Sequence, residues 1–177
     1  MGLGEVRKEI NRIDDSMKLL FNERMNCSNQ VAEVKISEND SVFKPLREKE
    51  ICERFADDEE YLTFIKKVMQ ISRKRQYGIF LERKVDMMMS NKLMAVKDLV
   101  LERGVLELKL MADKTSTKGL NVKDIISIVA DTSLEINSLN VDDEGQVHMV
   151  LQVNRNEKSV KEAWTLACML YEETINN

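Results

Sequence analysis

Apolar residues recur three and four positions apart along the N-terminal part of the chain, which is the spacing of a long amphipathic helix. The stripe consists of Leu3, Val6, Ile10, Ile13, Met17, Leu20, Cys27, Val31 and Val34. We expect a helix over residues 4–36, about nine turns at 3.6 residues per turn. A helix of this length in a small protein needs packing partners along its whole length, and intertwined dimerisation is a common way to supply them.

Two further helices are predicted after a polar loop at residues 37–44. Pro45 suits the first turn of a helix that runs to about Phe55. Acidic residues at 57–60 favour the start of a third helix, which is predicted to end near Arg83.

From about residue 85 the pattern changes, and apolar and polar residues begin to alternate. A short helix is expected over residues 91–102, closed by Gly104. Beyond it the pattern predicts strands at 105–111, 134–141 and 146–153, and helices at 121–130 and 159–171.

We therefore expect an all-α helical domain at residues 1–84, a linker with a helix at 85–104, and a small α+β domain at 105–177. The predicted order in the last part is strand–helix–strand–strand–helix.

Two polar residues interrupt the apolar stripes of the helical part. Arg24 occupies a position of the first stripe where an apolar residue is expected, and Gln76 does the same on the third helix. A buried arginine is costly unless an anion meets it. A bundle that points cations inward is suited to hold a small anion. Both residues could instead fix the register of a coiled coil.

Charge and cysteine content narrow the class of protein. The net charge of −4 argues against a nucleic-acid or anionic-membrane partner. The three cysteines are far apart and show no metal-ligand spacing, which is typical of reduced thiols in the cytosol. The chain enters an amphipathic helix directly and has no apolar run long enough to span a bilayer. We expect a cytoplasmic protein that needs no metal.

A set of residues over positions 5–80 resembles the all-helical class of chorismate mutases. The matching residues are Arg7, Ile13-Asp14, Leu20, Glu23-Arg24, Val31, Val34-Lys35, Pro45, Arg47-Glu48, Ser72 and Gln76. Each match alone is weak, because any one of the charged residues is more often a solvated helix charge. The whole set, with its spacing in register, is specific. Lys44 departs from the family, in which an acidic residue is common at this place.

The resemblance implies an isomerase that performs the Claisen rearrangement of chorismate to prephenate. This pericyclic reaction needs no general base, nucleophile or cofactor. The enzyme has to hold a flexible dianion in a compact shape and stabilise negative charge that grows on the breaking ether oxygen. Arginine, lysine and amide side chains meet these needs.

The resemblance also implies a role for each site residue. Arg24 would clamp one substrate carboxylate, and Arg7 would reach a carboxylate from the partner subunit of a homodimer. Arginine suits both tasks because its fork binds carboxylates through two hydrogen bonds. Lys35 and Gln76 would donate hydrogen bonds to the ether oxygen.

Three further residues complete the implied site. Arg47 would help to hold the carboxylate side of the substrate, Glu48 would accept from the ring hydroxyl, and Ser72 would be a supporting polar contact. Met69 and Arg73 would alter the wall of the pocket.

The element order of the C-terminal part resembles the ACT family of small regulatory domains, with a ferredoxin-like order. That resemblance implies a phenylalanine or tyrosine effector near the loop at residues 113–119. The family's last strand is missing here, and a dimerisation or docking module is the alternative.

The interpretation as a whole is a cytosolic, homodimeric chorismate mutase of phenylalanine and tyrosine biosynthesis. Two alternatives are an isochorismate pyruvate-lyase on the same scaffold and a non-enzymatic helical interaction protein.

Overall fold

The computed structural model describes residues 2–83, 100, 102–113 and 120–175. Three helices form the N-terminal part: α1 (Leu3–Glu38), α2 (Pro45–Arg54) and α3 (Glu59–Arg83). All three confirm the predicted helices to within a few residues. The helix expected at 91–102 lies largely outside the described residues.

Local chemistry defines the ends of α1. At the start, the Glu5 carboxylate accepts from the backbone N–H of Gly2 at 2.8 Å. At the end, Asn39 adopts the left-handed conformation with φ of 58°, which asparagine tolerates better than most residues. The backbone N–H of Asp40 then donates to the carbonyl of Lys35 at 2.8 Å. This turn reverses the chain and returns the loop that follows α1 to the side of Lys35.

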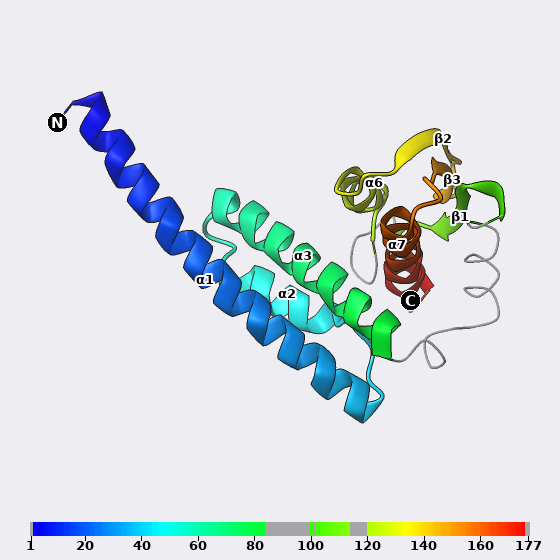
Figure 1. Cartoon of the computed structure of the whole chain (residues 1–177), viewed down its shortest axis with the longest axis horizontal. Coiled ribbons are helices and arrows are strands. Elements are labelled where there is room, and N and C mark those ends of the chain that lie inside the picture. Colours follow the sequence, from blue (N-terminus) through cyan, green and yellow to red (C-terminus); the bar gives the residue numbers. More distant parts are fainter. Residues whose placement is uncertain (1, 84–99, 101, 114–119, 176–177) are drawn as a thin grey trace.

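The helix α3 packs along the C-terminal half of α1, and α2 lies beside both (Figure 1). The buried apolar cluster between them contains Met25, Ile65 and Val68. The N-terminal half of α1 extends beyond the other helices (Figure 1). Its apolar stripe is therefore exposed in the single chain at Leu3, Val6, Ile10, Ile13, Met17 and Leu20.

The C-terminal part is a small α+β unit. Its elements are β1 (Val105–Met111), α6 (Val122–Ala130), β2 (Glu135–Val141), β3 (Gln146–Gln152) and α7 (Glu157–Ile175). The three strands form an antiparallel sheet in the order β1-β3-β2, with Leu108 opposite Met149. The predicted order of strands and helices is confirmed. Among the described residues no strand follows α7, and the resemblance to the ACT family stays a prediction.

The helix α7 joins the two parts of the molecule. It lies between α3 and the sheet, and it packs against both α3 and β1 (Figure 1). A continuous buried cluster includes Tyr77 and Phe80 of α3, Leu108 of β1 and Leu170 of α7. The end of α3 and the sheet are therefore held against a common helix.

Within the ranges that the structure describes, no helix combines the length and the hydropathy that crossing a membrane requires.

Candidate active site

A polar cluster lies between the C-terminal half of α1 and α3. Arg24 and Lys35 come from α1, whereas Ser72 and Gln76 come from α3, one helical turn apart. The Arg24 guanidinium donates to the Ser72 hydroxyl. The Lys35 ammonium donates to the Gln76 amide oxygen at 3.3 Å. The structure therefore brings together four of the seven site residues that were predicted from the sequence.

Ser28 links the two halves of this cluster. Its hydroxyl accepts from Gln76 Nε2 at 3.1 Å and donates to the Ser72 carbonyl at 3.3 Å. Ser28 and Gln76 are both buried, so these bonds fix the orientation of the amide: its oxygen faces Lys35 and its nitrogen faces Ser28. Sequence reasoning gave Ser28 no role. Ser28 follows Arg24 by one turn and lies on the same helix face, and this spacing could have indicated that it belongs to the cluster.

Lys35 is held by the loop that follows α1. Its ammonium donates to the carbonyl of Val42 at 2.6 Å. Burial lowers the pKa of Lys35, and the negative charge of Asp40 opposes this shift. Burial also lowers the pKa of Arg24. In the described part of the chain, no carboxylate lies within ion-pair distance of Arg24 or Lys35.

Two half-buried cations without a carboxylate partner are electrostatically unfavourable in the empty protein. Their charge is compensated best by an anion that enters between the helices. The amide and hydroxyl groups around them can in turn bind polar oxygen atoms of such a ligand. The arrangement is therefore suited to a small, oxygen-rich anion.

Glu48 lies at the edge of the cluster and binds Arg73. Both Glu48 carboxylate oxygens accept from Arg73 Nη1, at 2.5 and 2.6 Å. The Arg73 guanidinium also lies over the Phe43 ring, 5.4 Å from its centroid, which is a cation–π distance. Arg73 is 8% exposed. Arg73 was expected to alter the wall of the pocket. In the structure it forms an ion pair with Glu48, which is a proposed substrate-binding residue.

We predict that Arg73→Met lowers the free energy of unfolding by about 1–3 kcal/mol, because it leaves the half-buried Glu48 carboxylate without its cation. Arg47→Met is the matched control, because Arg47 forms an exposed pair with Glu50 on α2 at 2.9 Å. Loss of an exposed pair changes stability by roughly 0–1 kcal/mol. Urea unfolding measures both. An equal change in the free energy of unfolding for both substitutions would contradict the difference in burial between the Arg73–Glu48 and Arg47–Glu50 pairs.

Arg47 and Arg7 lie outside the cluster. Arg47 is exposed on α2 and is bound to Glu50. Arg7 is exposed near the start of α1. It precedes Arg24 by roughly 25 Å of helix axis at 1.5 Å per residue, so it does not reach the cluster of its own chain. Lys44 pairs with Asp40 in the loop before α2.

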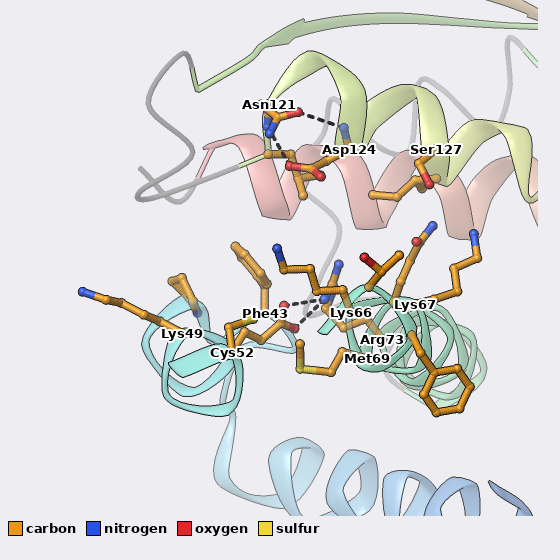
Figure 2. Close-up of a pocket in the computed structure, with 17 residues that line it drawn as sticks. Phe43, Lys49, Cys52, Lys66, Lys67, Met69, Arg73, Asn121, Asp124 and Ser127 are labelled. Atoms are coloured by element: carbon orange, nitrogen blue, oxygen red, sulfur yellow. Dashed lines mark hydrogen bonds and ion pairs between the residues drawn. The ribbon is translucent and has the colours of Figure 1, made fainter. Parts of the chain in front are cut away.

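A cavity of about 860 Å³ lies on the other side of the Glu48–Arg73 pair. Figure 2 shows Asp124 and Ser127 of α6, with Asn121 at its N-cap, on the side of this cavity opposite α2 and α3. Glu48 and Arg73 line this cavity, whereas Arg24, Lys35 and Gln76 do not. The ion pair therefore separates the polar cluster from the space beneath α6.

The helical segment matches a known family. Residues 6–77 match the family model described as chorismate mutase type II. This segment is therefore similar to chorismate mutase type II domains. No curated protein and no solved structure gives a significant match to the chain.

The matched segment extends from the first turn of α1 to Tyr77 of α3. It includes all the proposed site residues, from Arg7 to Gln76. The sheet, α6 and α7 lie outside the match.

Proposed function

We propose that this protein is a chorismate mutase that converts chorismate to prephenate, and that it acts in the cytoplasm in phenylalanine and tyrosine biosynthesis. The observation that carries the proposal is the pair Arg24 and Lys35 inside the segment that matches the chorismate mutase type II family: both cations are half-buried, and neither has a carboxylate partner among the residues that the structure describes. Chorismate is a dianion, and its two carboxylates supply the charge that the cluster lacks.

The proposed chemistry assigns Lys35 and Gln76 to the ether oxygen. An ammonium has three donors, and two of those on Lys35 are bound to Val42 and Gln76. The third is available for the oxygen on which negative charge grows. The Gln76 amide has two donors, one of which is bound to Ser28. As the ether C–O bond breaks and the new C–C bond forms, both residues stabilise the developing charge without transferring a proton.

Arg24 holds a carboxylate in this proposal. Its guanidinium exchanges the neutral Ser72 hydroxyl for a charged, two-point contact with the substrate. Arg47 helps to hold the carboxylate side, and Glu48 accepts from the ring hydroxyl beside Arg73. These contacts keep the substrate in its compact, reactive shape.

A second copy of the chain completes the proposed site. The exposed apolar stripe on the N-terminal half of α1 supports an intertwined homodimer, because burying these side chains is favourable. In such a dimer Arg7 of one subunit reaches the substrate bound by Arg24 of the other.

Identification of the products tests the proposal against its alternatives. With chorismate as substrate, we expect prephenate. Release of pyruvate and salicylate from isochorismate, without conversion of chorismate, would instead assign an isochorismate pyruvate-lyase. A folded protein without turnover of either compound would assign a helical interaction protein.

We also propose that residues 105–177 form a regulatory domain, connected by residues 85–104 to the helical domain at 1–84. We predict that phenylalanine or tyrosine binds the full chain with measurable heat in a calorimetric titration, because the order of its elements resembles a family that binds amino acids. The part of the expected effector loop at 114–119 lies outside the described residues. Absence of heat with both amino acids would reject the regulatory role and favour a docking module.

A further inference from the structure

The C-terminal helix α7 contributes a half-buried carboxylate to the surroundings of the polar cluster. Glu172 lies on α7, outside the matched segment, yet its Oε1 accepts from the backbone N–H of Val42 at 3.1 Å. Burial raises the pKa of Glu172, and the nearby Tyr77 side chain and the backbone of Val42 and Phe43 partly offset this rise. Glu172 therefore binds the loop between α1 and α2 from the opposite side.

Val42 connects Glu172 to Lys35. The N–H of Val42 is bound by Glu172, and its carbonyl accepts from the Lys35 ammonium at 2.6 Å. Val42 is 2% exposed. A buried residue held through both of its backbone polar groups has little freedom to move, because breaking either bond leaves a buried polar group unsatisfied.

The charges of the two side chains also interact. Glu172 raises the pKa of Lys35, and Lys35 lowers the pKa of Glu172. Asp40 and Glu48 also raise the pKa of Lys35, whereas Lys44 lowers it. Glu172 therefore affects the Lys35 ammonium in two ways: through its charge and through the hydrogen bond that fixes Val42.

We propose that Glu172 is a positioning residue for Lys35, which it holds through Val42. The catalytic part of this inference rests on the proposed function, whereas the link between Glu172 and Lys35 does not. Because α7 packs against both α3 and β1, the link ties the α+β part of the chain to the candidate active site. Displacement of α7 then moves the loop that holds Lys35.

The link is tested without activity by measuring the pKa of Lys35 in the full chain by NMR. Its ammonium signal is assigned by its loss in Lys35→Ala. Glu172→Gln keeps an acceptor for Val42 but removes the negative charge, so we expect a lower pKa for Lys35 than in the wild type. Glu162→Gln is the matched control. Glu162 also lies on α7 and binds Lys74 and the Ser133 hydroxyl, at 3.2 and 2.5 Å, but it is not among the groups that act on Lys35.

The catalytic consequence is tested by steady-state kinetics with chorismate. Small displacements of a catalytic group can cost ~100-fold in rate. For Glu172→Ala we expect kcat to fall roughly 10–100-fold with little change in KM. Glu172→Gln should recover part of this loss, and Glu162→Ala should stay within about twofold of the wild type, because it disturbs no contact of Lys35.

The outcomes separate the two proposals. An unchanged Lys35 pKa in Glu172→Gln would overturn the link. If Glu172→Gln alters the Lys35 pKa but Glu172→Ala and Glu162→Ala have the same kcat, the positioning role is overturned. If the wild type does not convert chorismate, the proposed function fails, while an altered Lys35 pKa would still support the link.

Discussion

Replacing Lys35 with alanine is expected to lower kcat for chorismate by about 100-fold or more, because removing one preorganised donor at a developing oxyanion typically costs 10²–10³ in rate. The half-buried ammonium is aligned by Val42 and Gln76 and has one donor left for the substrate. Water cannot replace it with the same geometry or charge. The loss should appear mainly in kcat, because the interaction strengthens as charge develops.

A second lysine on α1 provides the control for this substitution. Lys18 is exposed and forms no ion pair in the described part of the chain. Lys18→Ala is expected to keep wild-type turnover, and circular dichroism should show that both variants remain helical. Wild-type kcat in Lys35→Ala would contradict the assigned role.

Mixing two inactive variants is expected to restore about one quarter of the wild-type activity, if the site is shared across a twofold dimer. Arg7→Ala and Arg24→Leu each damage every site of their own homodimers. In a heterodimer one site combines the intact Arg24 of the first chain with the intact Arg7 of the second, whereas the other site carries both defects. Random mixing makes about half of the dimers heterodimers, each with one working site. Turnover of the mixture after joint unfolding and refolding measures this recovery.

The control for the mixture carries both substitutions in one chain. When the double variant is mixed with the wild type, every heterodimer site has one defect, so heterodimers should be inactive. A mixture of the single variants without recovered activity, from protein that is dimeric by ultracentrifugation, would show that Arg7 does not act across the interface.

The elements with strong local signals were predicted well from the sequence. The alternation of apolar and polar residues predicted β1 with its observed bounds, and Pro45 marked the first residue of α2. The irregular pairing of β2 with β3 between Ile136 and Ser138 was not predicted. It depends on how two strands align, which the periodicity of either strand does not determine.

The candidate site was predictable where its residues follow helical spacing. Arg24 and Lys35 on one helix, and Ser72 and Gln76 on another, lie together as expected. The contacts of Glu48 with Arg73 and of Glu172 with Val42 were not predicted, because they depend on how separate elements pack together, which the spacing within one helix does not determine. The positions of Arg7 and Arg47 relative to a substrate depend on a second chain and a ligand, which the fold of one chain does not determine.

Chorismate mutase activity is tested by the loss of chorismate absorbance when the purified full chain is added, with prephenate identified as the product. We expect stoichiometric conversion of chorismate to prephenate, and we expect Arg24→Leu to abolish it. Chorismate that remains unconverted by folded, dimeric protein would contradict the proposed function and would mean that the inward-facing cations serve another anion.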